Sequence, residues 1–183
     1  MVAAAVLAGL VPSGSAQPEP PSPTPVLLVD PGRGIGPYRL ELGLERILAR
    51  LGRAGAERAV VDMAQATRDC TVRARGRVVR FTWRPEGLWV TADADTGALR
   101  VLAAFGTSGP FVTDRGVRLG TPLDRAERLY GPGAQHVECE LPRGLRARVI
   151  RYRDLGIQFT GFEGPTPHAG RVWEIGVFRP GVF

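Results

Sequence analysis

The sequence predicts an α+β fold of two tandem repeats, each a short helix packed on one face of an antiparallel β-sheet. Three observations predict it: a helical motif that occurs twice, a strand motif that also occurs twice, and a globular composition. The chain has 183 residues, of which 44% are hydrophobic and 23% charged, so it has room for one ordinary domain or two small ones. We assign the first repeat to residues 34–106 and the second to residues 107–183.

An apolar segment at residues 2–11 has the length of a signal-peptide hydrophobic region and is too short to span a bilayer. Small residues precede Gln17 and suit cleavage there. We therefore expect residues 1–16 to be a signal peptide and the protein to be exported to a bacterial periplasm or the extracellular space. No cysteine follows the apolar segment, so we expect no lipid anchor. Residues 17–33 begin with QPEPPSPTP and are predicted to form a proline-rich linker.

Each repeat begins with a predicted amphipathic helix. The segments PYRLELGLERILARLG (37–52) and GVRLGTPLDRAERLYG (116–131) align with apolar residues at i, i+3 or i+4, and i+7. The apolar stripe stops at Gly52 in one segment and at Gly131 in the other, where glycine commonly lets a chain leave a helix. We expect both helices to contribute packing rather than chemistry.

Strands are predicted to follow each helix. CTVRARGRVVRFTWRPEGLWVT, from Cys70, aligns without a gap with CELPRGLRARVIRYRDLGIQFT, from Cys139, and the closing strands are GALRVLAAF and GRVWEIGVF. Apolar residues alternate with polar ones along these strands. The alternation predicts that the helices cover one face of the sheet and leave the opposite face open.

These motifs, a short β-segment, a helix ending in Leu-Gly or Tyr-Gly, and hairpin strands, resemble the module of the BamE/SmpA family of outer-membrane assembly proteins. Two such modules in one exported chain are similar to the tandem architecture of the β-lactamase inhibitor protein family. The resemblance covers residues 34–183. It implies a role in envelope assembly or in the inhibition of a secreted hydrolase.

The open sheet face is the predicted partner-binding site. It carries residue types that are enriched at binding hot spots, namely Trp89, Arg80, Arg84, Arg151 and Arg153. Such a surface suits a protein partner or an acidic ligand. The alternative is that Trp89 packs across the strands on the stems of neighbouring arginines, on a solvated face.

The net charge of +6 does not by itself predict a nucleic-acid partner. All 24 basic residues are arginine, and the chain has neither lysine nor asparagine, which indicates codon usage in a GC-rich genome. No arginine run with interleaved aromatic residues is present. We therefore expect neither nucleic-acid binding nor a transmembrane segment.

The two cysteines occupy the same position in both repeats. An oxidising compartment allows one pairing, Cys70 with Cys139, which would stabilise the fold by about 4 kcal/mol. We favour the other interpretation, in which Cys70 and Cys139 are two separate, buried free thiols. His136 and His168 do not give these cysteines the ligand spacing of a zinc site, so we expect no metal.

The segment TADADTG (91–97) starts like a calcium loop, but Ala104 stands where that loop needs a glutamate, so a hairpin turn is predicted.

We expect no cofactor. The sequence contains no pattern that combines a nucleophile, a general base and oxyanion-hole donors, as a catalytic site would require. The sequence therefore predicts a non-catalytic, exported protein-binding or cell-envelope assembly module. One alternative is a proteinaceous inhibitor of a secreted hydrolase, and a second is a small hydrolase with a pocket near His136 or Asp62.

Overall fold

The computed structural model describes residues 25–53, 55–62, 77–141 and 144–181. It is mostly β, with 46% strand and 14% helix. Twelve strands form two sheets in the described residues, and two α-helices of eight residues each accompany them. The predicted fold class, an α+β protein of two helix-plus-sheet repeats, is therefore wrong. The helices are short, and additional strands form where the sequence shows no alternating pattern.

Four of these additional strands form a small sheet in the order β3-β2-β1-β8. β1 pairs in parallel with β8, and the backbone N–H of Leu27 donates to the carbonyl of Pro110 at 2.7 Å. β1 therefore lies inside the segment 17–33, which its proline content predicts to be a linker. The strands are β1 (Leu27–Asp30), β2 (Gly34–Ile35), β3 (Tyr38–Arg39) and β8 (Phe111–Thr113).

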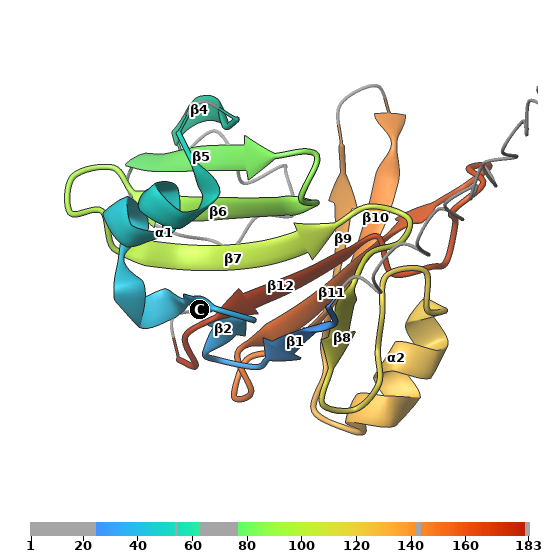
Figure 1. Ribbon diagram of the computed structural model, residues 1–183. Helices are drawn as coiled ribbons and strands as arrows, with labels where there is room; N and C mark the ends of the chain where they lie inside the picture. The colour runs from blue at the N-terminus through green and yellow to red at the C-terminus, as the bar shows by residue number, and fades with distance from the viewer. Residues whose placement is uncertain (1–24, 54, 63–76, 142–143, 182–183) are drawn as a thin grey trace, which may run out of the picture.

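The other eight strands form one antiparallel sheet in the order β4-β5-β6-β7-β12-β11-β10-β9 (Figure 1). Chain neighbours pair outward from the centre, where β7 and β12 join the two halves into a continuous sheet. The strands are β4 (Glu57–Asp62), β5 (Arg77–Trp83), β6 (Leu88–Asp93), β7 (Leu99–Phe105), β9 (Gln135–Glu140), β10 (Arg146–Tyr152), β11 (Ile157–Glu163) and β12 (Glu174–Phe178).

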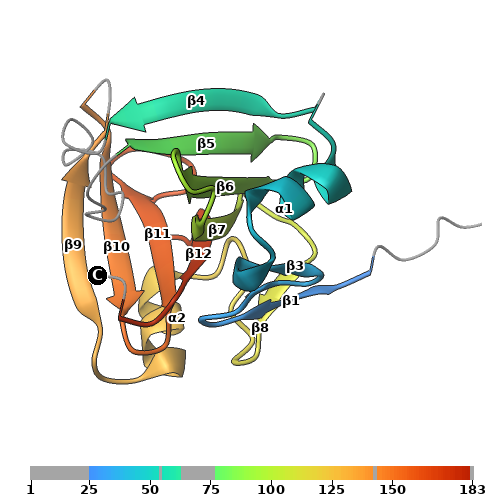
Figure 2. The same cartoon turned by 90° about the vertical axis from the view of Figure 1, so that its left-hand side faces the viewer.

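The large sheet bends, so that β4 and β5 cross the top of Figure 2 while β9 and β10 run down its left side. The helices α1 (Leu44–Leu51) and α2 (Leu123–Tyr130), a short 3-10 helix (Leu40–Leu42) and the small sheet lie within the bend. We call the sheet face that packs against them the inner face and the opposite one the outer face. No helix in the described residues is long and apolar enough to cross a membrane.

The inner face carries the main hydrophobic core. On β5 the alternating residues Val79, Phe81 and Trp83 are buried there, as the sequence predicted. Gly52 and Gly131 end the two helices with φ of +82° and +78°, which confirms the predicted helix ends. Because packing fills the inner face, a ligand would reach the described residues at the outer face or at the loops at its ends.

Candidate functional site

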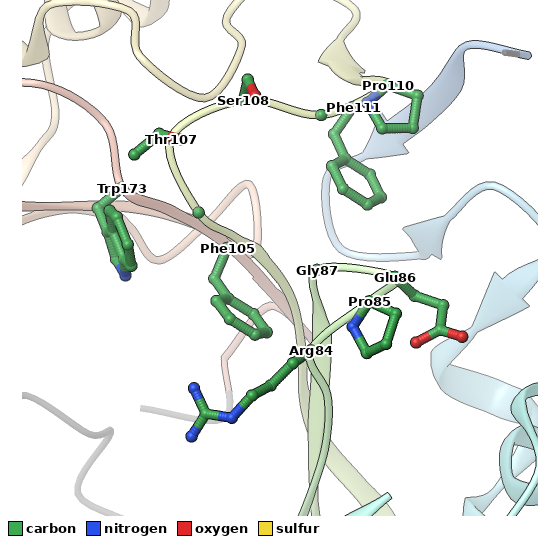
Figure 3. Close-up of a pocket in the computed structure, with 12 residues that line it drawn as sticks. Arg84, Pro85, Glu86, Gly87, Phe105, Thr107, Ser108, Pro110, Phe111 and Trp173 are labelled. Atoms are coloured by element: carbon green, nitrogen blue, oxygen red, sulfur yellow. The ribbon is translucent and has the colours of Figure 1, made fainter. Parts of the chain in front are cut away.

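A hollow of about 410 Å³ lies at the end of β7. Its walls come from the β5–β6 turn (84–87), the β7–β8 connection (105–111) and Trp173, which directly precedes β12. In Figure 3 the rings of Phe105 and Trp173 point to the same side of the β7–β8 connection, with Arg84 below them in the view. We call this site the aromatic hollow. Its size falls within the usual range for ligand sites.

Backbone hydrogen bonds hold the walls of the aromatic hollow in place. The N–H of Phe105 donates to the carbonyl of Gly87 at 2.8 Å, and a Cβ on Gly87 would lie 2.9 Å from the carbonyl oxygen of Phe105. The β5–β6 turn thus lies against the end of β7 only because residue 87, with φ of +63°, is glycine. On the other wall, Gly106 donates to the carbonyl of Trp173 at 2.9 Å, and Trp173 donates to that of Thr160 at 2.8 Å.

The three tryptophans differ in what their indole N–H groups bind. Trp83 is fully buried and donates to the carbonyl of Gly52 at 2.8 Å, and Trp89 donates to the carboxylate of Glu174 at 2.9 Å. Trp173 is partly exposed, and its indole N–H donates to no described residue. Buried tryptophans normally find an acceptor, so within the described chain the indole N–H of Trp173 is the one left available to a ligand.

Arg84 stands at the rim of the hollow in a two-point ion pair with Glu57. Its Nε and Nη2 atoms lie 2.8 and 3.1 Å from the two carboxylate oxygens. The hydrogen bond to Arg84 lowers the pKa of Glu57, and the same bond raises the pKa of Arg84. This pairing orients the guanidinium while its remaining N–H groups face solvent, because both side chains are mostly exposed.

A polar cluster lies next to the hollow on the outer face. The carboxylate of Glu174 accepts from Trp89 and, at 3.2 Å, from the hydroxyl of Thr160. The guanidinium of Arg80 stacks 4.5 Å from the ring centre of Trp89, while its buried Nε atom has no partner in the described part of the chain. Burial raises the pKa of the Glu174 carboxyl, an effect that Arg80 and the hydrogen bonds from Trp89, Thr160 and Gln158 oppose. This cluster ties β5, β6, β11 and β12 together.

The five predicted partner-binding residues do not form one exposed surface. Trp89 and Arg151 are each 7% exposed and Arg80 is partly buried, whereas Arg84 and Arg153 are exposed. Of the five, Arg84 alone lines the aromatic hollow. The contact of Trp89 with Arg80 matches the alternative in which the tryptophan packs across strands, but on a buried face rather than a solvated one.

Three aromatic residues line the hollow, Phe105, Phe111 and Trp173, and none of them was among the predicted site residues. A signal for Phe105 existed, because alternation along β7 places it on the same face as Ala103, away from the core. No comparable signal marks Trp173 in the sequence, since it precedes its strand. Its ring packs against Phe162 and His168, with centroid distances of 5.2 and 6.0 Å.

The residues considered for covalent or metal chemistry do not meet at the hollow. Cys139 is buried and disulfide-bonded, which excludes a free thiol at that position, and Cys70 lies outside the described residues. His136 sits on edge strand β9 and pairs with Glu127 at 3.0 Å. No group of three or more His, Cys, Asp or Glu residues in the described ranges could hold a metal ion. The side chain of Asp62 is likewise outside the described part.

The segment TADADTG contains the end of β6 and the turn that leads to β7, as the predicted hairpin requires. One carboxylate oxygen of Asp93 accepts from the backbone N–H of Thr96 at 2.9 Å, and the other pairs with Arg100 at 2.8 Å. The hydrogen bond from Arg100 is the largest of the effects that hold the pKa of Asp93 well below its usual range. Asp93 therefore closes a hairpin with its carboxylate.

The fold and the hollow define a sheet-dominated chain with an aromatic surface site. Neither a protein-family model, nor a curated protein, nor a solved structure matches this chain. The resemblance to the BamE/SmpA and β-lactamase inhibitor protein families therefore stays a prediction. Function is accordingly inferred from the geometry of the hollow.

Proposed function

We propose that this chain is a non-catalytic protein-binding module of an exported or cell-envelope protein, and that the aromatic hollow is its binding site. One observation carries the proposal. Trp173 presents a partly exposed ring, and an indole N–H that no described residue accepts, at a hollow whose walls are held by backbone bonds. Tryptophan and arginine are the residue types most enriched at binding hot spots, and Arg84 stands at the rim.

The polar groups near the hollow support binding rather than catalysis. In the described residues no hydrogen bond joins a serine hydroxyl to a histidine ring, the arrangement that would activate a nucleophile. The hollow is lined by aromatic rings, backbone amides, the guanidinium of Arg84, the carboxylate of Glu86 and the hydroxyls of Thr107 and Ser108, which can bind a partner through apolar contact and hydrogen bonds. The predicted acidic ligand would meet Arg84, although Glu57 already neutralises much of that charge.

The test is quantitative cross-linking capture from envelope extract and culture medium, with the purified chain as bait and mass spectrometry of the captured proteins. We expect Trp173→Ala to lower the yield of each specific partner at least tenfold relative to the wild type. Leu129→Ala is the matched control, because Leu129 is an exposed apolar residue on α2, outside the hollow. Equal capture by the wild type and the Trp173 variant would contradict the proposal.

The export that the proposal assumes is tested separately. The mass of the intact secreted chain should correspond to cleavage before Gln17. A chain found only inside the cell would contradict this part of the proposal and leave the binding site to be judged on the capture experiment.

A further inference from the structure

We infer that strand β4 is a docking edge, at which a second copy of this chain adds its own β4 in antiparallel orientation. The inference goes beyond the proposed function, because it concerns one edge of the large sheet and not the aromatic hollow. It is drawn from three features of β4: its free backbone groups, the apolar row that ends at Val60, and the order of its charges.

β4 lies at one end of the large sheet and pairs with β5 alone within the described chain. Figure 2 shows it across the top of the view, with no labelled strand beyond it. Its register with β5 is unbroken by a bulge, and the strand contains no proline. Bulges and prolines are among the features by which natural sheet edges avoid pairing with another chain. β4 therefore presents a regular edge that a further strand can extend.

Alternate residues of β4 direct their backbone groups to this free edge. The N–H of Ala94 donates to the carbonyl of Arg77 at 3.0 Å, in the register of the β5–β6 pair. Because hydrogen-bonded pairs alternate along antiparallel strands, β5 bonds to β6 through its odd-numbered residues and to β4 through its even-numbered ones. The even-numbered residues of β4 face odd-numbered residues of β5. The backbone N–H and C=O groups of Arg58, Val60 and Asp62 therefore point away from the sheet.

An apolar row on the inner face ends at Val60. It crosses the sheet through facing residues on β7, β6, β5 and β4, namely Leu99, Ala92, Val79 and Val60. The first three are 4%, 0% and 6% exposed, whereas Val60 is 50% exposed. A valine of a second copy placed against Val60 would continue the row and remove apolar surface from water.

The order of charges on β4 suits pairing with a second copy. In the antiparallel register centred on Val60, the two valines face each other, and Arg58 of each copy stands opposite Asp62 of the other. Arg58 is exposed and has no ion pair with a described residue. These positions carry the free backbone groups, so each facing pair can exchange both of its hydrogen bonds. A register shifted by one residue would instead place Glu57 opposite Asp62, two like charges.

The other edge strand, β9, does not suit the same pairing. The N–H of Leu141 donates to the carbonyl of Leu145 at 2.6 Å, in the register of the β9–β10 pair. By the same alternation, His136, Glu138 and Glu140 direct their backbone groups outward. Self-pairing centred on Glu138 would put two carboxylates face to face. Pairing of β4 with β9 of a second copy would leave a free edge at each end and build an open chain of molecules, which is an outcome of the test.

The test is sedimentation equilibrium of the full chain over a wide range of concentration. A single edge strand is a small interface, so we expect the average mass to rise from that of one chain to that of two as the concentration increases. The mass of one chain at every concentration would overturn the inference. Growth past two chains would overturn it as well, because a two-fold contact at β4 closes after one pairing.

Variants of the edge test the register. Val60→Lys sets like charges against each other at the centre of the pairing, so the dimer should weaken by roughly tenfold or more. Arg58→Glu should weaken it a few-fold, and Arg58→Glu with Asp62→Arg should restore the wild-type affinity, because opposite charges face each other again. Such restoration cannot result from misfolding. Arg125→Glu, at an exposed position on α2, is the matched control and should change nothing.

A dimer that survives Val60→Lys would overturn the inference, and so would a double variant that pairs no better than Arg58→Glu alone. The proposed function is judged separately, since Trp173→Ala should leave the dimer unchanged and Val60→Lys should leave capture at the hollow unchanged. A wild-type chain that stays monomeric, but loses capture of a partner protein in Val60→Lys, would replace the inference with an edge that accepts a strand of another protein.

Discussion

Two tryptophans on the outer side of the sheet, Trp89 and Trp173, differ in their surroundings, and we propose opposite roles for them. Trp89 is buried, stacks on Arg80 and gives its indole N–H to Glu174. Trp173 is the residue directly before Glu174, yet it is partly exposed and its N–H bonds to none of the described residues. The two tryptophans differ in whether the indole N–H has an acceptor within the described chain. An indole N–H with an acceptor helps to stabilise the fold, whereas one without an acceptor can donate to a partner.

The largest expected effect is on the buried tryptophan. Trp89→Ala should lower the free energy of unfolding by about 3 to 5 kcal/mol, because it empties a packed site and removes a donor from Glu174. Urea denaturation followed by circular dichroism measures this. A cost below about 1 kcal/mol would show that the residue is not part of the packed interior and would remove the contrast with Trp173.

The next largest effect is expected at Glu174, the acceptor of the Trp89 indole N–H, and concerns how the free energy of unfolding depends on pH. Burial raises the pKa of Glu174, so its contribution to stability is fully present below its ordinary pKa of 4.5 and is lost as pH rises through the raised value. Arg80, Trp89, Thr160 and Gln158 face this carboxyl and limit the loss. In Glu174→Gln, this decline in unfolding free energy with rising pH should disappear. Parallel urea-denaturation profiles for the two proteins would contradict the prediction.

A smaller effect on stability is expected at the exposed tryptophan. Trp173→Ala should lower the free energy of unfolding by about 1 kcal/mol, because its ring packs against Phe162 and His168 without full burial and its N–H bonds to no described residue. The same variant should lose partner capture. Equal destabilisation by Trp89→Ala and Trp173→Ala would erase the distinction between a packing tryptophan and a binding one.

The smallest effect is expected at the rim. Arg84→Gln should leave the melting temperature unchanged, because the ion pair with Glu57 is exposed and such pairs contribute little to stability. Partner capture should weaken a few-fold through loss of donors at the rim. A clear drop in melting temperature in differential scanning calorimetry would assign the pair to the fold instead.

Local patterns in the sequence predicted local features of the fold. Alternation placed Phe81 and Trp83 in the core, and glycines marked the helix ends, because each signal spans only a few neighbouring residues. The small sheet was not predictable in this way. Its strands have two to four residues, too few to show alternation, and β1 pairs with β8 across more than eighty residues of chain.

The candidate site depended on similar long-range contacts. Alternation assigned Trp89 to the outer face correctly but could not indicate that this part of the face is buried, since its partner Glu174 is 85 residues away. The aromatic hollow assembles from three segments that meet only in the folded chain. Residue types predicted a binding surface with tryptophan and arginine, and this stays a prediction. Contacts between distant strands determine which tryptophan has an indole N–H without an acceptor in the described chain.

The central pairing of β7 with β12 determines which backbone amides of the large sheet should exchange with solvent last. Both strands have hydrogen-bonded neighbours on each side, so their amide protons meet solvent only when much of the sheet separates. Deuterium should therefore enter the edge strands β4 and β9 first and this seam last. Since Phe105 ends β7 and Trp173 directly precedes β12, two of the three rings of the hollow are attached to the part of the sheet that should exchange most slowly.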